Sequence, residues 1–175
     1  MSDILPAPCV ETPTAQDIAD WQRVIAQVAR HYRITYSAGS LQAAANWQSE
    51  QPLAQVLKNL GRQAGLQARI LNEEIGQISR WQLPLAVQLR DGQIGVILSF
   101  DGEDRVAVCL ARDAELINRY PLQELLSEIR LVVALRPSAQ ARKQTAPQSA
   151  PQTPERIAWG TTEQESPGHK PASKK

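Results

Sequence analysis

The sequence predicts an α+β fold in which three N-terminal helices pack on a small antiparallel β-sheet of four or five strands. Two observations lead to this prediction. Apolar residues recur at helical spacing from residue 14 to residue 64, and they alternate or run together, as in strands, from residue 66 to residue 137. An Asp-Gly pair between two of the apolar runs is typical of an antiparallel hairpin. Helices packed on one antiparallel sheet form a stable layered architecture.

The first predicted helix starts at a capping-box-like pair and ends near His31. Thr14 can cap the first turn, and Asp17 stands three residues later, where Glu is more usual. The apolar residues that follow recur every three or four positions and so share one face: Ile18, Trp21, Ile25, Val28 and Tyr32.

Two further helices are predicted before the first strand. Ser40 is expected to cap a short helix over residues 41–48. Ser49 and Pro52 open the third helix, because proline is favoured at the start of a helix. Gly65 stands where a glycine often ends a helix in a left-handed conformation.

The strand half begins with alternating apolar residues over 66–71, which favour a strand with one buried face. Residues 73–81 are predicted to form a short helical turn. Strands are expected over 85–90 and 93–100. The Asp91-Gly92 pair between them favours a two-residue hairpin turn.

Three more segments complete the predicted sheet region. Residues 105–111 alternate like a strand, and residues 121–129 have the spacing of a short amphipathic helix. Residues 131–135 are all apolar, which indicates a central or well-covered strand.

A change in composition marks both ends of the folded region. Residues 1–13 contain three prolines, and residues 138–175 are rich in Pro, Gln and Ser. Segments with so few large apolar residues cannot offset the entropy lost on ordering. We therefore expect a flexible N-terminus over 1–13, a folded domain over 14–137, and a disordered tail or linker over 138–175.

Composition and charge argue against several classes of protein. The chain has 175 residues and a net charge of +1, and residues 1–137 carry a net charge of −2. This balance argues against a winged-helix nucleic-acid binder, which also has three helices and a hairpin. No apolar run is long enough to span a membrane, and the N-terminus does not read as a secretory signal, which favours the cytoplasm. Two cysteines and two histidines leave little capacity for a metal site.

The predicted segments follow one another in a distinctive order. A helix ends in HYRITY, a later helix runs into GLQARIL, LPLAVQLRDGQIGVIL forms the hairpin, and PLQELLSEI precedes the last apolar strand. This order resembles the family-39 cysteine peptidase domain at the N-terminus of bacterial ABC exporters, and the resemblance covers residues 15–137. It implies a papain-like fold. Active members of that family cleave the leader peptides of bacteriocins.

The three catalytic positions that the resemblance implies do not carry catalytic residues. The place of the nucleophilic cysteine, fourteen residues before Ile34, falls on Asp20. The place of the histidine, two residues after the Asp-Gly turn, falls on Ile94, and that of the orienting aspartate lies near Cys109. A carboxylate, an alkyl group and a thiol in these roles cannot run the reaction. A shift of one residue restores nothing, because no histidine lies between Tyr32 and His169.

The resemblance therefore implies an inactive relative, of the kind found in type I secretion exporters of unfolded repeats-in-toxin (RTX) adhesins and haemolysins. Its implied role is to tether the unfolded substrate near the pore, at the cytoplasmic face of the inner membrane. The implied partners are that substrate and the membrane and nucleotide-binding domains of the exporter. No cofactor is expected in this chain, because ATP would bind the nucleotide-binding domain.

Five aromatic residues near the ends of predicted elements are candidates for binding the unfolded peptide, because aromatic side chains supply large contact areas. They are Tyr32, Tyr36, Trp47, Trp81 and Trp21. Trp21 also falls on the apolar face of the first helix, so core packing is the alternative there. Addition of the peptide to a sheet edge is a second route.

Two other functions stay open at the level of sequence. A free-standing interaction or regulatory module could have the same fold and serve a partner unrelated to secretion. A hydrolase with a different nucleophile is the other alternative, which a leader-peptide cleavage assay would separate from the rest.

Overall fold

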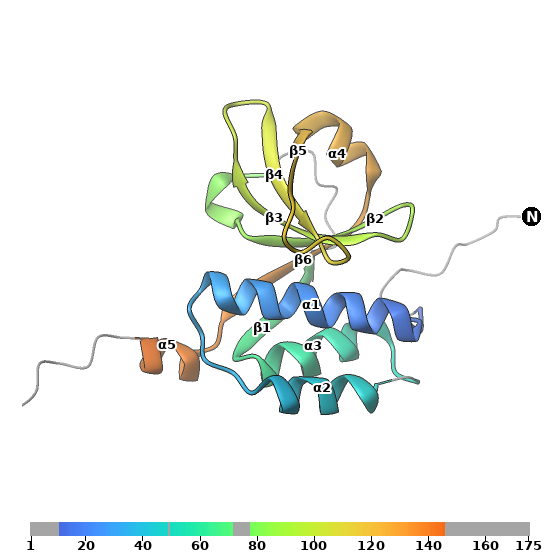
Figure 1. The fold of residues 1–175 in the computed structure, drawn as a ribbon, viewed down its shortest axis with the longest axis vertical. Helices are drawn as coiled ribbons and strands as arrows, with labels where there is room; N and C mark the ends of the chain where they lie inside the picture. Colours follow the sequence, from blue (N-terminus) through green and yellow to red (C-terminus); the bar gives the residue numbers. More distant parts are fainter. Residues whose placement is uncertain (1–10, 49, 72–77, 146–175) are drawn as a thin grey trace, which may run out of the picture.

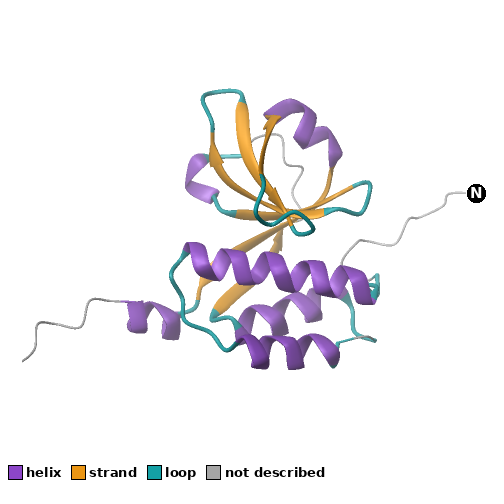
Figure 2. Ribbon diagram, viewed as in Figure 1, coloured by secondary structure: helices purple, strands orange, loops and turns teal. Residues whose placement is uncertain are grey.

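Three helices lie on one side of a six-stranded antiparallel sheet in the computed structural model, which describes residues 11–48, 50–71 and 78–145 (Figures 1 and 2). The α+β class is thus confirmed, with one strand more than expected. The three-helix layer consists of α1 (Ala15–His31), α2 (Ala38–Asn46) and α3 (Leu53–Gln63). A six-stranded sheet does not fit the alternative of a winged helix.

The strands are paired in the order β1-β6-β2-β3-β4-β5. Their bounds are β1 (Leu66–Leu71), β2 (Leu85–Leu89), β3 (Ile94–Phe100), β4 (Arg105–Leu110), β5 (Ile117–Pro121) and β6 (Ile129–Pro137). The long β6 pairs with both β1 and β2, so it runs from the helical layer into the part of the sheet that curls away from it (Figure 1). Two short helices accompany the sheet, η1 (Arg80–Gln82) before β2 and α4 (Leu122–Glu128) before β6.

A first hydrophobic core joins the helices to one face of the sheet. Helix α1 begins at the predicted capping box, in which the Thr14 hydroxyl accepts from the Asp17 backbone N–H and the Asp17 carboxylate accepts from the Thr14 backbone N–H. Its apolar face then packs on β3 and β6, while α3 packs on β1. Burying this face removes apolar area from water, which is the main stabilising term in folding.

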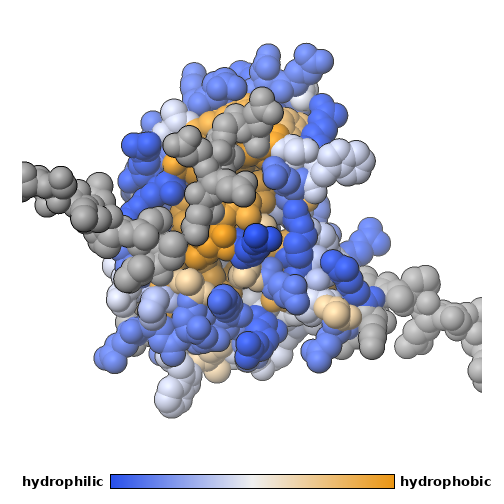
Figure 3. Space-filling view, turned by 180° about the vertical axis from the view of Figure 1, so that it is seen from behind, coloured by the Kyte–Doolittle hydropathy of each residue, from blue (hydrophilic) through white to orange (hydrophobic). Residues whose placement is uncertain are grey.

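A second core lies inside the curled part of the sheet. Alternate residues of β2, β3 and β4 point into it, and Leu125 of α4 closes it from the other side. Seen from behind, apolar residues gather over this upper part of the molecule, with hydrophilic residues around them (Figure 3). Alternation along a strand separates the two cores, since Ile94 and Val96 belong to the first and Ile97 to the second.

Local details differ from the predictions at three points. The N-cap of α2 is Ser37, whose hydroxyl accepts from the Ser40 backbone N–H, so the helix starts earlier than predicted. The last hydrogen bond of the hairpin runs from the Leu89 backbone N–H to the Gln93 carbonyl, so the loop has three residues instead of two. The third of them, Gly92, has φ +86°. Strand β5 was not predicted.

The segments at either end of the predicted domain are partly ordered. Glu11, placed in the flexible N-terminus by the sequence, accepts a backbone hydrogen bond from Leu53 and pairs with Arg130. Helix α5 (Ala139–Thr145) falls in the predicted disordered tail, so that prediction is wrong for residues 139–145. The rest of the tail, and residues 73–77 of the predicted turn, lie outside the described residues. No helix in the described ranges has the length and apolar character needed to cross a membrane.

Candidate functional site

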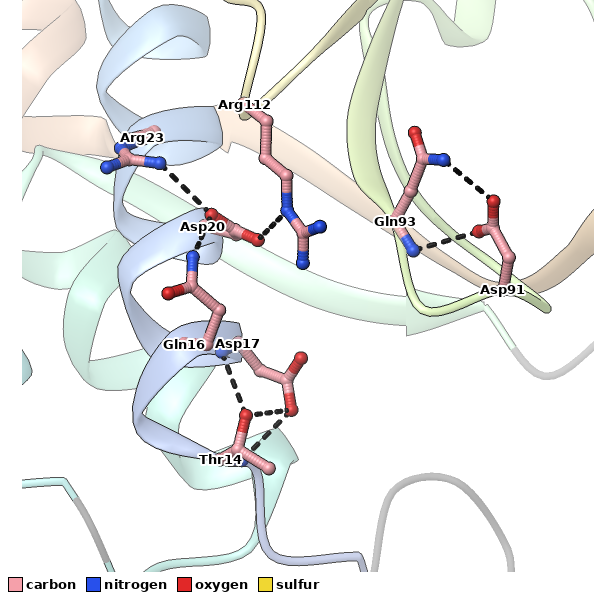
Figure 4. Close-up of polar contacts among 8 residues, drawn as sticks. All are labelled: Thr14, Gln16, Asp17, Asp20, Arg23, Asp91, Gln93 and Arg112. Carbon is pink, nitrogen blue, oxygen red and sulfur yellow. Dashed lines mark hydrogen bonds and ion pairs between the residues drawn. The ribbon is translucent and has the colours of Figure 1, made fainter.

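Asp20, the residue at the implied nucleophile position, is 1% exposed on α1. Its Oδ1 accepts from Gln16 Nε2 at 3.0 Å and from Arg23 Nη1 at 3.2 Å, and its Oδ2 accepts from Arg112 Nε at 3.4 Å (Figure 4). A buried carboxylate needs such partners, because an unpaired charge is costly to remove from water. The three hydrogen bonds use three of the roughly four lone-pair sites of the carboxylate.

Ile94 and Cys109 lie on neighbouring strands, in the same core as α1. The Ile94 carbonyl accepts the Ala111 backbone N–H at 2.8 Å, and the Cys109 thiol donates to the Ala114 carbonyl at 3.0 Å. Together with the Asp20–Arg112 pair, these contacts hold the same segment, residues 111–116 between β4 and β5. We call this segment the β4–β5 loop. All three implied catalytic positions therefore contact this loop, Asp20 and Cys109 through their side chains and Ile94 through its backbone carbonyl.

The described residues offer no imidazole to the Cys109 thiol or to Asp20. Within the described ranges the one histidine is His31, at the other end of α1 and eleven residues from Asp20, or roughly 16 Å along a helix. Cys109 is 1% exposed in the core, which is typical of an inert structural thiol. The same part of the chain contains no group of three or more potential metal ligands.

The predicted aromatic residues do not form one cluster. Tyr32 is partly buried, and its hydroxyl accepts from Arg136 Nη1 at 3.0 Å. The Nη2 group of Arg136 donates to the carbonyl of Gln82, so Tyr32 is linked to the last residue of η1. The link runs through the Gln82 backbone, and the indole of the neighbouring Trp81 is exposed to solvent.

The other three aromatic residues have separate environments. Trp21 is fully buried in the first core, so the alternative of core packing holds for this residue. Tyr36 is partly buried against that core. Trp47 is 83% exposed at the C-terminal end of α2, at the opposite end of that helix from Tyr36.

Trp81 is 93% exposed and follows Arg80 in the chain, and Arg80 lines a shallow cavity of about 320 Å³ that sequence reasoning missed. The cavity is lined by Arg80, Leu83, Leu98, Ser99 and Phe100. The Arg80 guanidinium sits 5.6 Å from the centre of the Phe100 ring and donates to the Gly102 carbonyl. We call this hollow, together with Trp81, the η1 site. Its lining combines the apolar side chains of Leu83, Leu98 and Phe100 with the cation of Arg80, and together with the exposed indole it offers contacts for an extended peptide.

A second group of exposed apolar side chains is the pair Leu116 and Ile117, where the β4–β5 loop joins β5. Because β5 has one neighbour among the described strands, its other edge is a place for strand addition. The pair directly follows a charged stretch, ARDAE, and this contrast in the sequence could have marked it.

The architecture matches known structures, although no protein-family model and no curated protein matches the sequence. The N-terminal peptidase C39 like domain of the toxin secretion ATP-binding protein from Vibrio parahaemolyticus aligns with a TM-score of 0.54 at 21% identity, over 68% of this chain and 97% of that one. The fold is that of the peptidase C39-like domains.

Two further C39-type structures show the same likeness. The peptidase domain of Streptococcus ComA, a bifunctional ABC transporter involved in quorum sensing, aligns with a TM-score of 0.52 at 18% identity, over 69% of this chain and 93% of that one. A double glycine motif protease from an AMS/PCAT transporter, in complex with the leader peptide, aligns with a TM-score of 0.54 at 13% identity, over 69% of this chain and 86% of that one. The papain-like fold expected from the sequence is thereby confirmed.

Proposed function

We propose that this chain is a non-catalytic C39-like domain of a type I secretion ABC exporter, which holds the unfolded secretion substrate before translocation. The substrate is an RTX-type adhesin or toxin. The domain works at the cytoplasmic face of the inner membrane, next to the membrane and nucleotide-binding domains of the exporter. It uses no cofactor of its own.

The observation that carries the proposal is the state of Asp20. The residue at the implied nucleophile position is buried and bonded to three donors, and the other two implied catalytic positions carry an alkyl side chain and a buried thiol. Covalent catalysis needs a nucleophile within reach of a base. The side chains of Asp20 and Cys109 instead hold the β4–β5 loop.

Peptide binding is supported by the η1 site. An indole that is 93% exposed costs solvation free energy, which a partner can recover by covering it. Relatives of the same fold include a protease solved with its leader peptide, so an extended polypeptide is a ligand that this fold can accommodate. Affinity should be modest, because an unfolded partner loses conformational entropy when it is held.

A cleavage assay tests the first half of the proposal. The full chain is incubated with a synthetic double-glycine leader peptide, next to an active peptidase domain of this fold as the positive control. We expect no product from this chain. Cleavage would overturn the proposal in favour of a hydrolase with another nucleophile.

An NMR titration tests the second half. The isotope-labelled full chain is titrated with a C-terminal fragment of an RTX protein, unfolded without calcium and folded with calcium. We expect amide shifts confined to one surface, seen with the unfolded fragment alone. Absence of shifts under both conditions would contradict tethering and favour an interaction module that serves another partner.

A further inference from the structure

A second cavity, of about 370 Å³, lies on the helical layer between α3, β1 and the start of α5. Its size is within the range of small-molecule sites. Apolar residues, among them Ile34, Leu66 and Ala68, form part of its wall. The remaining lining is mostly cationic or polar: Thr35, Lys58, Arg62, Gln63, Gln67, Ser138 and Gln140. We call it the α3–α5 cavity.

The charge of this cavity is wholly positive. Lys58 and Arg62 stand four residues apart on α3, so their side chains are neighbours on one face of the helix. In the described part of the chain neither makes an ion pair, whereas Arg23, Arg112 and Arg119 each pair with an aspartate. Among the described residues that line the cavity there is no carboxylate. Like charges at this spacing repel, so the pair lowers helix stability unless an anion lies between the two groups.

The walls of the cavity are tied together by backbone contacts. The Ser138 N–H donates to the Gly65 carbonyl at 2.9 Å, and the Ser138 hydroxyl accepts from the Ala141 N–H at 3.2 Å. Gly65 has φ +74°, and a Cβ there would lie 3.0 Å from Ile34 and 3.3 Å from Ala141. This close packing fixes the start of α5 against the turn after α3, so the cavity has a defined shape.

We propose that the α3–α5 cavity binds a phosphate-bearing ligand. The Arg62 guanidinium offers a fork of donors that matches phosphate oxygens, and Lys58 adds a second positive charge, so the pair can bind the dianion of inorganic phosphate or the monoanion of a phosphodiester headgroup. Side-chain amides and hydroxyls around them can donate to the remaining oxygens. This site is separate from the η1 site, and it does not depend on the proposed secretion role. The phosphate can belong to a free small molecule or to a lipid headgroup.

Two arms of one experiment distinguish these sources. In the first, the isotope-labelled full chain is titrated with inorganic phosphate at low ionic strength, and the amide signals of Gly65 and Ser138 are followed. In the second, the chain is sedimented with vesicles of phosphatidylglycerol and phosphatidylcholine, or of phosphatidylcholine alone. We expect saturable shifts at both amides. Co-sedimentation that requires phosphatidylglycerol supports a headgroup, and shifts without co-sedimentation support a free phosphate.

The variant K58Q/R62Q removes both charges from the cavity, and R30Q/R90Q removes two exposed arginine charges outside it. We expect the first variant to lose about tenfold or more in phosphate affinity, the scale of losing charged hydrogen bonds, and the second to keep it. The proposal is overturned if neither arm shows binding, or if the two variants lose affinity equally.

Discussion

The Asp20 carboxylate on α1 accepts a hydrogen bond from the Arg112 guanidinium in the β4–β5 loop, with 3.4 Å between Oδ2 and Nε. The two residues are 92 positions apart in the sequence, so the contact joins the helical layer to the far part of the sheet. Asp20 is buried and Arg112 is exposed, and the loop therefore lies over the carboxylate. At the position where the resemblance implies a nucleophile, this chain has an anchor for a loop.

Replacing Asp20 by alanine is expected to lower the free energy of unfolding by about 1–3 kcal/mol. The change removes the shared acceptor of Gln16, Arg23 and Arg112. The loss should stay within this range because both guanidinium groups are exposed and can be hydrated in the variant. Urea unfolding followed by circular dichroism measures it.

Asp104→Ala is the matched control for this measurement. Asp104 is exposed, and its side chain makes no hydrogen bond or ion pair with the described residues, so the change should stay within about 0.5 kcal/mol. If Asp20→Ala and Asp104→Ala have equal effects, the Asp20 network contributes nothing to stability.

The Cys109 thiol should report on the same loop. Its Sγ lies 3.0 Å from the Ala114 carbonyl, so a labelling reagent reaches it when the β4–β5 loop opens. In a Cys9→Ser background, we expect slow labelling of the native protein and a rate about tenfold higher after Asp20→Ala, equivalent to about 1.4 kcal/mol in the opening equilibrium. Reaction with a chromogenic disulfide under native conditions measures the rate.

Thr14→Ala separates loop opening from general destabilisation. It removes the cap of α1, which costs about 1 kcal/mol, and it touches neither the loop nor Cys109. This variant should leave the labelling rate close to that of the parent. Equal acceleration in both variants would mean that labelling follows global unfolding, and that Asp20 does not hold the loop.

The elements that the sequence predicts well are those with local signals. Helix α1 has its capping box and one apolar face, and Gly65 ends the α3 region with a positive φ. Strand β5 has no such signal, because INRYP is largely polar and ends in proline. It is a strand because it pairs with β4, from Arg105 opposite Pro121 to Cys109 opposite Ile117. Strand pairing of this kind cannot be predicted from a short window of sequence.

The same distinction applies to the candidate site. Gln16 and Arg23 lie four residues before and three after Asp20, so their contacts with it follow from helical spacing. Arg112 reaches Asp20 only through the folded sheet. The sequence identifies the aromatic residues at the ends of elements. It does not show that Arg136 links Tyr32 to η1. The sequence also does not show which of the tryptophans are buried: Trp21 is in the core and Trp81 is exposed.

Trp81→Ala should weaken binding of an unfolded substrate fragment about tenfold, the effect of losing an aromatic anchor at an interface. The free energy of unfolding should change by less than about 0.5 kcal/mol, because the indole is 93% exposed. Calorimetric titration of each variant with the calcium-free fragment gives the affinities.

Trp47→Ala is the control, since Trp47 is also highly exposed and lines neither the η1 site nor the α3–α5 cavity. It should bind as the parent does. Tyr36→Ala is unsuitable as a binding test, because Tyr36 packs against the first core and its loss affects stability as well. Parent-like affinity of Trp81→Ala would remove the η1 site from the proposal.

Two glycine-to-alanine variants should shift stability in opposite directions. At Gly95 in β3, a Cβ would lie 2.9 Å from the Cys109 carbonyl oxygen and 3.0 Å from a Leu110 methyl group, so the β3–β4 pair must move apart. Overpacking of this kind costs about 1–3 kcal/mol. At Gly39 in α2, a Cβ would meet nothing closer than the Ser37 hydroxyl at 3.9 Å, and the lower entropy of the unfolded chain should stabilise the protein by about 0.4–1 kcal/mol. Urea unfolding of both variants tests the close pairing of β3 with β4, which positions the Ile94 carbonyl to accept from Ala111. A neutral Gly95→Ala would show that these strands lie farther apart than the structure places them.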